Sequence, residues 1–171
     1  LMIAQRQPMA NDLREIMAAM KISADLERVG DLAKNISKRV IAINSPFAAK
    51  KLVIGVEHLS EIALDQLKNV LDAYSARDAA GAAAVRQRDD EIDALYTSLF
   101  RELLTYMMED PRNITFCTHL LFVAKNIERI GDHATNIAET VQYLVTGEQP
   151  TEARPKSDMS SLTNVEFKGD N

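Results

Sequence analysis

The sequence predicts an all-α protein, and three observations lead to this fold class. The prolines are confined to Pro8, Pro46, Pro111, Pro150 and Pro155. The long stretches between them are rich in Ala, Leu, Glu, Lys and Met, which have high helix propensity. Apolar residues recur at steps of three and four, the period of a helix that buries one face. No segment shows the alternation of a half-buried strand, so helices account for the whole pattern.

The composition is that of a folded, acidic protein. The chain has 171 residues, of which 46% are hydrophobic and 26% are charged, and its formal net charge is -5. Its 20 Lys and Arg residues are scattered, so nucleic acid is not an expected partner. Cys117 is the only cysteine, which excludes an internal disulfide and a thiolate metal cluster. No apolar run approaches the ~20 residues that span a bilayer. We therefore expect a cytoplasmic protein without a transmembrane segment.

Helices are predicted at about 10–43, 50–76, 79–108 and 111–146. The segment "NSPF" at 44–47 ends the first helix, Asp78 can cap the third, and Asp110 followed by Pro111 is a typical start for the fourth. Short connections make successive helices antiparallel. Residues 50–146 are therefore predicted to form an up-down three-helix bundle.

One segment occurs twice, and this repeat predicts the domain organisation. "LERVGDLAKNISKRV" at 26–40 and "IERIGDHATNIAETV" at 127–141 share eight identical residues, each 101 positions apart. The apolar seam of each copy follows the same steps. The seams are Leu26, Val29, Ala33, Ile36, Val40 and Ile43, and Ile127, Ile130, Ala134, Ile137, Val141 and Leu144. Residues 1–44 are thus expected to be the remnant of an earlier, matching bundle whose leading helices are largely missing.

The residues after Val145 change in composition. They are rich in Gly, Pro, Ser and Thr, which is typical of a tail. We expect residues 147–171 to be flexible or to dock on the apolar face of the 10–43 helix. That helix carries more apolar surface than one bundle can cover, so self-association is the other expectation.

Each copy of the repeat carries an acidic pair one turn apart. Glu27 with Asp31, and Glu128 with Asp132, repel each other at a cost of ~0.2–0.5 kcal/mol per pair. A glycine within each helix costs ~1 kcal/mol more relative to alanine. The glycines therefore predict that another group approaches the helix closely at that point. The acidic pairs predict that a cation offsets the repulsion between their carboxylates. A solvated acidic face is the simpler alternative.

A third acidic pair, Asp89 and Asp93, lies on the preceding helix. Helices packed ~8–10 Å apart can bring two such pairs into one pocket of four carboxylates. All-oxygen ligands favour Mg, Mn, Ca or iron. The first copy continues into Lys34 and Lys38, which can neutralise its acids, so the second copy is expected to bind metal more readily.

A catalytic function has less support from the sequence. A di-iron oxidase bundle needs Glu-x-x-His, whereas the third residue after Glu27 and after Glu128 is glycine. The three histidines are scattered and no Gly-rich phosphate loop is present. We do not expect an enzyme, although a metal-dependent hydrolase or a metal-storage bundle remains the alternative.

Five segments together resemble the PhoU family of phosphate-transport regulatory proteins. They are "RQPMANDLREI", "ADLERVGDLAKNI", "DDEIDALY", "LLTYMMEDPRNI" and "NIERIGDHATNI". The resemblance implies two similar three-helix bundles and a negative regulator of phosphate uptake and of the phosphate-starvation response. It implies a cytoplasmic, membrane-peripheral protein whose partners are the ATPase subunit of the phosphate ABC transporter and a sensor histidine kinase.

The resemblance also bears on the acidic pairs. Members of the family can carry metal ions on Glu/Asp-x-x-x-Asp motifs. The matching residues here are Glu27 with Asp31, Asp89 with Asp93, and Glu128 with Asp132. The cofactors expected from it are divalent ions of iron, zinc, magnesium or manganese.

Overall fold

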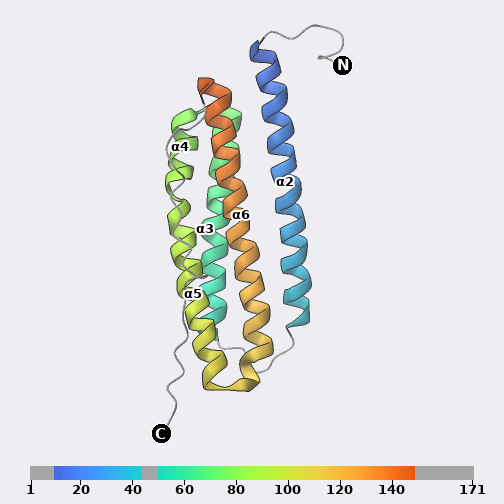
Figure 1. Ribbon diagram of the computed structural model, residues 1–171, viewed down its shortest axis with the longest axis vertical. Helices are drawn as coiled ribbons and strands as arrows, with labels where there is room; N and C mark the ends of the chain where they lie inside the picture. Colours follow the sequence, from blue (N-terminus) through green and yellow to red (C-terminus); the bar gives the residue numbers. More distant parts are fainter. Residues whose placement is uncertain (1–9, 44–49, 149–171) are drawn as a thin grey trace.

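The computed structural model describes residues 10–43 and 50–148, and this part of the chain is a bundle of long helices (Figure 1). In order these are α2 (Ala10–Ala42), α3 (Lys50–Ala76), α4 (Ala79–Gln87), α5 (Asp89–Glu109), the short 3₁₀ turn η1 (Pro111–Asn113) and α6 (Ile114–Thr146). No strand occurs in the described residues. The predicted all-α fold class is confirmed.

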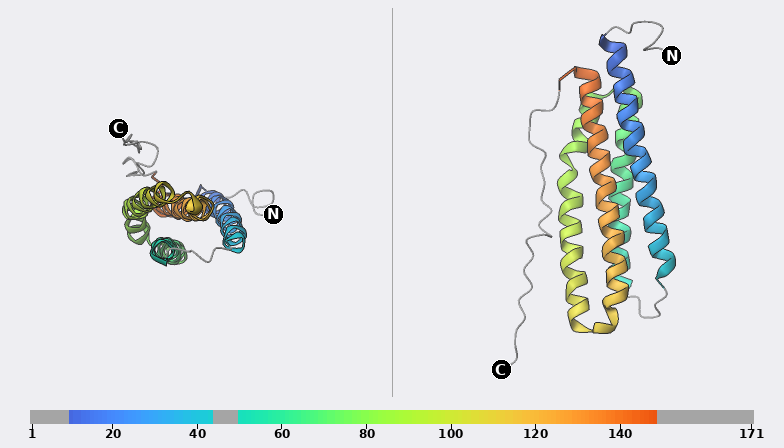
Figure 2. Two further views of the ribbon diagram at one scale, coloured as in Figure 1. Left: turned by 90° about the horizontal axis from the view of Figure 1, so that it is seen from below. Right: turned by 45° about the vertical axis from the view of Figure 1, so that its right-hand side comes forward.

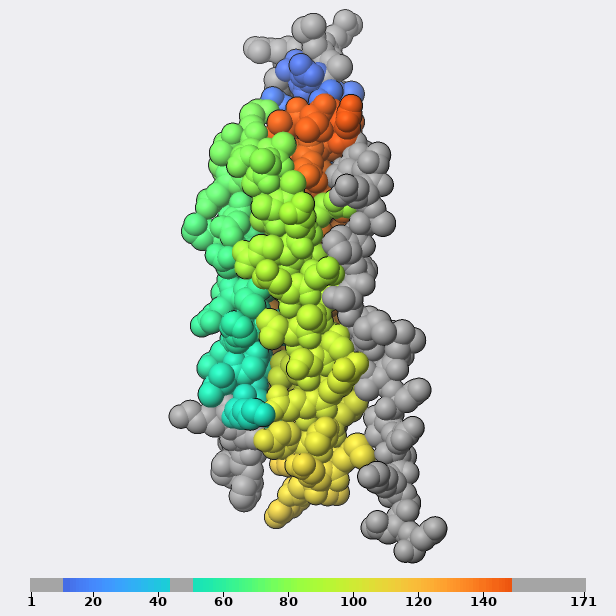
Figure 3. Space-filling model, turned by 90° about the vertical axis from the view of Figure 1, so that its left-hand side faces the viewer, coloured from blue at the N-terminus to red at the C-terminus, as the bar shows by residue number. Residues whose placement is uncertain are grey.

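Helix α6 is the centre of the molecule. It packs against α2, α3, α4 and α5, and the end-on view in Figure 2 places it between α2 and the other helices. Every predicted seam residue of its repeat is buried: Ile127, Ile130, Ala134, Ile137, Val141 and Leu144. On the face that lies to the left in Figure 1, α4 and α5 form one ridge beside α3, and the C-terminal end of α6 is visible at the top (Figure 3). The predicted bundle of residues 50–146 is therefore present.

Local signals lie near both ends of α6, and the predicted signal of Asp110 with Pro111 starts the short turn η1 that precedes the helix. The Asp110 carboxylate accepts a hydrogen bond of 2.9 Å from the Arg112 backbone N–H, and Pro111 occupies the first position of the turn. Gly147 ends the helix with a φ of 80°, a left-handed conformation that glycine adopts without a steric cost. Local sequence therefore determines where this central helix starts and stops.

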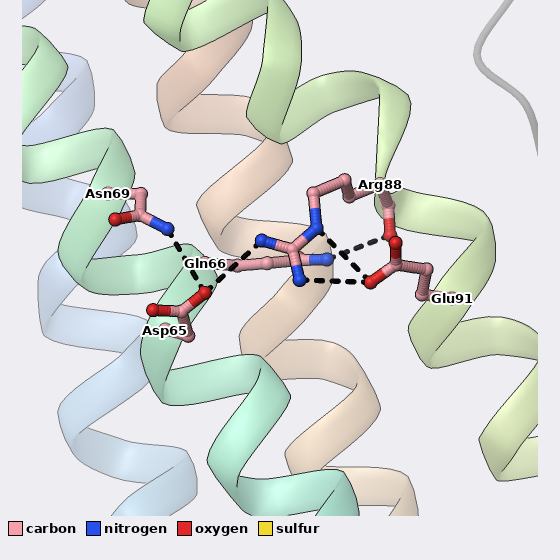
Figure 4. Close-up of polar contacts among 5 residues, drawn as sticks. All are labelled: Asp65, Gln66, Asn69, Arg88 and Glu91. Carbon is pink, nitrogen blue, oxygen red and sulfur yellow. Dashed lines mark hydrogen bonds and ion pairs between the residues drawn. The ribbon is translucent and has the colours of Figure 1, made fainter.

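The prediction of one continuous helix at 79–108 is wrong. The chain there forms two helices, α4 and α5, which are separated by a break at Arg88 (Figure 4). Arg88 has φ -89° and ψ 4°, and its carbonyl accepts hydrogen bonds of 2.8 Å from Gln66 Nε2 and 3.1 Å from the Glu91 N–H. Its guanidinium lies 3.1 Å from Asp65 and 3.0 Å from Glu91. Hydrogen bonds to these two carboxylates raise the pKa of Arg88. The break is thus held by side chains of α3 as well as of α5.

The predicted seam of α2 is only partly correct. Val29 and Ile36 pack against the core, but Leu26, Ala33 and Val40 are exposed. The fully buried apolar residues of α2 are Ala18, Ile22 and Leu32. The reason is that α2 packs mainly against one helix, α6, so only one narrow stripe of it is covered. The large apolar side chains that it leaves exposed are Leu13, Met17, Met20, Leu26, Val40 and Ile41.

Candidate functional site

The acidic residues of α5 and of the second repeat meet at the α5–α6 interface. Asp89, Asp93 and Glu128 are only 3%, 5% and 5% exposed, and Asp132 is partly buried. The contact between Tyr96 and Lys125 fixes how the two antiparallel helices are aligned. Gly131 of α6 lies against Ile92 of α5 along the same interface. Asp89, Asp93 and Glu128 are therefore buried where α5 and α6 pack together, whereas the predicted pocket of four carboxylates stays a prediction.

Two of these carboxylates have well-defined partners. The Thr135 hydroxyl donates a hydrogen bond of 2.8 Å to Asp89 Oδ1 within the interface. The Lys125 ammonium donates one of 2.9 Å to Glu128 Oε1 and lies 4.8 Å from the centroid of the Tyr96 ring. The Glu128 side chain is 6% exposed and that of Lys125 is 41% exposed. The Lys125 ammonium is thus already paired with the buried Glu128 carboxylate.

The donor set fits a hard cation in chemistry. All four acidic side chains offer oxygen ligands, and they lie where an uncompensated negative charge is costly. Across residues 10–43 and 50–148, however, no three or more His, Cys, Asp or Glu side chains are arranged to hold an ion as they stand. Binding of a divalent ion therefore requires side-chain rearrangement at this interface.

The acids of the first repeat are in a different environment. Glu27 is 64% exposed at its side chain and Asp31 is also exposed. The nearest cation to Glu27 is Arg28, whose Nε lies 3.8 Å away, and both side chains are in solvent. Neither acid lies with the α5 pair. Of the two predicted sites, only the second has acidic residues from two helices within the described part of the chain.

The two glycines differ in the same way. A Cβ at Gly131 would lie 2.6 Å from Ile92 Cδ1, so α5 approaches α6 closely at this point. At Gly30 a Cβ would meet no atom within 4 Å. The close approach predicted for the glycines is present at Gly131, and its partner is an apolar side chain of the core.

Sequence reasoning missed the two side chains that connect the acidic residues to their surroundings. The first is Lys125, which lies three residues before Glu128, a spacing that pairs side chains on a helix. The second side chain is His133, whose Nδ1 lies 2.8 Å from Asp25 Oδ1 and joins α6 to α2. Glu128 of the second repeat therefore has a lysine as counter-charge, whereas the sequence led us to expect lysine counter-charges only in the first copy.

A groove of about 900 Å³ runs between α2 and α6. Its walls include the basic residues Arg14, Lys21 and Arg28 together with the His133–Asp25 pair. The Arg14 guanidinium lies 5.6 Å from the centroid of the Tyr143 ring, across the groove. The groove adjoins the exposed apolar face of α2. None of the acidic pairs lines it.

None of the helices described here combines the length and the apolar character that crossing a membrane requires.

Comparison with known proteins decides the family. The sequence profile of the PhoU domain matches residues 1–40 and 56–141, which is more than half of the chain. The chain belongs to the PhoU family. A relative from Rhizobium meliloti (strain 1021) is 69% identical over 159 residues, covering 93% of this chain and 67% of the relative. One from Caulobacter vibrioides is 54% identical and covers 94% of this chain and 70% of the relative.

Solved structures agree with this family assignment. The crystal structure of PhoU from Pseudomonas aeruginosa matches with a TM-score of 0.82 and 41% identity, covering 86% of this chain and 70% of that one. The phosphate transport system regulatory protein PhoU from Streptococcus pneumoniae matches with a TM-score of 0.77 and 30% identity, covering 85% and 68%. The resemblance read from the sequence is confirmed.

The relatives' names bear on the choice between catalysis and regulation. The proteins from Rhizobium and Caulobacter are both named "phosphate-specific transport system accessory protein PhoU homolog". That name describes an accessory role beside a transport system. As a member of this family the chain is a regulatory accessory protein and not an enzyme, which argues against the hydrolase alternative.

Proposed function

We propose that this protein is a negative regulator of phosphate uptake that acts through the phosphate-specific transport system. It contacts the ATPase subunit of the phosphate ABC transporter and a phosphate-sensing histidine kinase on the cytoplasmic side of the membrane. The observation that carries the proposal is the 69% identity, over 93% of the chain, to a relative named as an accessory protein of that system. The acidic surface charge argues against a nucleic-acid partner.

The partner proposal is tested by direct binding. The purified chain is immobilised, and the ATPase subunit and the cytoplasmic part of the kinase are passed over it separately. We expect saturable binding to each. A variant of the α2–α6 groove, Arg14→Ala with Lys21→Ala, asks whether this basic surface takes part. Failure of the wild-type chain to bind either protein contradicts the proposal.

We further propose that the α5–α6 interface holds a divalent cation, of iron, zinc, magnesium or manganese. The ligands would come from Asp89, Asp93, Glu128 and Asp132, and the ion would neutralise their charge and tie α5 to α6. Burial of three of these acids and the all-oxygen donor set support the assignment. Glu27 and Asp31 are a second, incomplete pair that needs carboxylates from a further helix.

The metal proposal is tested by melting curves with chelator and with each metal in turn. Binding to the folded state alone stabilises it by ~2.7 kcal/mol at a hundredfold excess over the dissociation constant. Glu128→Gln with Asp132→Asn should abolish this rise in melting temperature. The matched control, Glu27→Gln with Asp31→Asn, changes the exposed copy and should keep it. If no metal changes the melting temperature of the wild-type protein, the metal proposal is wrong and the acidic pairs have a purely structural role.

We also propose that the exposed apolar face of α2 is an interface for self-association, with a homodimer as the simplest form. Leu13, Met17 and Met20 are 44%, 48% and 63% exposed on this helix. Contiguous apolar side chains of this size are typical of interaction surfaces. Light scattering after size exclusion should show a mass above 19.0 kDa for the wild type. Met17→Glu with Met20→Glu should reduce it to the monomer, and a monomeric wild type at high concentration contradicts the proposal.

A further inference from the structure

We propose that the groove between α2 and α6 is the docking site of an acidic amphipathic helix from a partner protein. The inference goes beyond the partners proposed above, because it states the chemistry of the docked segment and not the protein that supplies it. It rests on a row of three basic residues, Arg14, Lys21 and Arg28, along the α2 wall of this groove of about 900 Å³. The two walls, α2 and α6, lie side by side and run antiparallel (Figures 1 and 2).

The two acidic residues of the groove have basic partners of their own. Asp25 Oδ1 lies 2.8 Å from His133 Nδ1, a contact that joins the two walls. Glu139 Oε1 lies 3.5 Å from the Nε of Arg86, which is only 7% exposed. The basic row is therefore not neutralised by the acids beside it, although the whole chain has a net charge of -5.

The three bases are open to an anionic group. Among the described residues, no carboxylate pairs with Arg14 or Lys21. The Arg14 guanidinium lies 5.6 Å from the centroid of the Tyr143 ring, and Lys21 is exposed. The Nε of Arg28 lies 3.8 Å from Glu27, and both of these side chains are in solvent. An incoming carboxylate therefore breaks no buried ion pair when it binds to this row.

The spacing of the row selects a helix as the occupant. The three bases are seven residues apart, so they recur every ~10.5 Å along one side of α2. A helix that lies along the groove repeats its side chains at the same distance, so carboxylates seven residues apart can face all three bases. An extended strand rises ~3.3 Å per residue, and its residues three apart, which would match this distance, point to opposite faces. The row therefore fits a helix and not an extended peptide.

The apolar lining of the groove requires an amphipathic helix. Leu13 and Met17 line the groove and are 44% and 48% exposed, whereas Ala18 at its base is 2% exposed. A helix that covers these side chains has an apolar stripe beside its acidic row, as in other helix-in-groove complexes. A planar membrane surface would reach the rim of the groove but not its base. A protein helix is therefore favoured over an anionic lipid surface.

This sequence does not contain the complementary acidic row. Its 25 Asp and Glu residues include no three that follow one another at seven-residue spacing. A second copy of the chain therefore has no helix that matches the basic row. The apolar face proposed for self-association shares Leu13 and Met17 with the groove, so the two interactions would compete. The acidic helix is accordingly placed on another protein.

Two labelled peptides of ~22 residues, long enough to span the row as helices, are the probes. Both have three glutamates and the same leucines in an alanine and glutamine background. The glutamates are seven residues apart in the matched peptide and five apart in the control peptide, which scatters them around the helix. Circular dichroism checks that the two have equal helicity. The matched peptide should bind the full chain about tenfold more tightly in fluorescence anisotropy, because it forms three ion pairs at once. Equal affinities, or no binding of the matched peptide, overturn the proposal.

A charge exchange tests the middle of the row. Lys21→Glu should weaken binding of the matched peptide about tenfold, because an attraction becomes a repulsion. Replacing the central glutamate of the peptide by lysine should restore its affinity for this variant. The control is Lys34→Glu, the same change at an exposed position of α2 outside the groove, and it should stay within about twofold of the wild type. If Lys34→Glu weakens binding equally, or if the exchange restores nothing, only overall charge matters and the groove is not the site.

A competition experiment distinguishes a helix from lipid. Vesicles of phosphatidylglycerol should not displace the matched peptide from the wild-type chain, and displacement would make an anionic membrane surface the occupant and overturn the proposal. The peptides contain neither the ATPase subunit nor the kinase. A negative result with them therefore leaves the partners proposed above in place, and failure of those two proteins to bind leaves the groove's preference for an acidic helix in place.

Discussion

The two copies of the repeat, at 26–40 on α2 and at 127–141 on α6, have similar sequences and very different environments. They share eight identical residues. Glu128 is 5% exposed in an interface with α5, whereas the Glu27 side chain is 64% exposed. The same residue therefore acts as a buried charge in one copy and as a solvated one in the other.

The difference lies in the neighbours of each helix. Helix α6 is surrounded by α2, α3, α4 and α5, whereas α2 packs mainly against α6. Ile137 is accordingly fully buried and its counterpart Ile36 only partly. The repeated sequence determines a helix with an apolar seam. Packing of other helices decides how much of that seam is covered.

The comparison is tested most strongly by truncating the same isoleucine in both copies. Ile137→Ala removes a fully buried side chain and should lower the free energy of unfolding by ~3 kcal/mol, within the range for such truncations in cores. Ile36→Ala should cost about half as much, because its side chain is partly in water. Urea unfolding followed by circular dichroism measures both. Equal losses would show that α2 is packed as tightly as α6 in solution.

The seam of α6 was predictable from sequence because it depends on spacing within one helix. Its cap at Asp110 and its end at Gly147 were local signals as well. The break at Arg88 was not predictable in this way, because Gln66 of α3 holds the Arg88 carbonyl from 22 residues away. The exposure of the α2 seam also depends on which helices lie beside it, which spacing alone does not give.

The candidate site, like the helices, was predictable only where it depends on spacing within one helix. The i, i+4 spacing pairs Asp89 with Asp93, and Glu128 with Asp132, along one face of each helix, and the structure buries three of these four acids. The sequence did not reveal that Lys125 would turn toward Glu128 and Tyr96. Nor did it reveal the pair of His133 with Asp25, because this contact joins residues 108 positions apart.

The two glycines should respond to alanine with opposite signs. Gly30→Ala meets no atom within 4 Å and should stabilise the protein by ~1 kcal/mol through helix propensity. Gly131→Ala places a methyl group 2.6 Å from Ile92 Cδ1 in a packed core, which costs ~1–3 kcal/mol before the same gain in propensity. We expect a net loss of roughly 1 kcal/mol in chemical denaturation.

The control for the glycine pair removes the atom that clashes. Ile92→Val deletes Cδ1, so Gly131→Ala should cost less in the Ile92→Val background than in the wild type. A stabilising effect of Gly131→Ala in the wild-type background would show that the contact with α5 relaxes freely.

The glutamates provide a smaller contrast in metal-free protein. Glu128→Gln breaks the 2.9 Å ion pair with Lys125 and should destabilise by about 1 kcal/mol. Glu27→Gln changes an exposed side chain and should stay within ~0.5 kcal/mol of the wild type. Both are measured by urea unfolding in the presence of chelator. If Glu128→Gln is instead more stable, repulsion from the neighbouring acids outweighs the lysine, and Lys125 is not an effective counter-charge.

The smallest effect is expected for a change at the start of α6. It tests whether local helix signals or the packing of other helices cause the different burial of the two copies. Asp110 bonds the Arg112 guanidinium at 2.7 Å, and this hydrogen bond lowers the pKa of the Asp110 carboxyl. The pKa of Asp110 is then lower in the folded than in the unfolded chain.

The stability that the Asp110 carboxylate contributes is therefore present above the usual Asp pKa, near pH 4, and is lost as the pH falls through the lower folded value. Asp110→Asn keeps a capping side chain and removes the charge. The difference in melting temperature between wild type and Asp110→Asn should be small at pH 7 and should shrink toward zero below pH 4. A difference that does not change with pH would assign the effect to cap geometry. A loss as large as that of Ile137→Ala would mean that the second copy owes its burial to the start of its helix, and not to the helices packed around it.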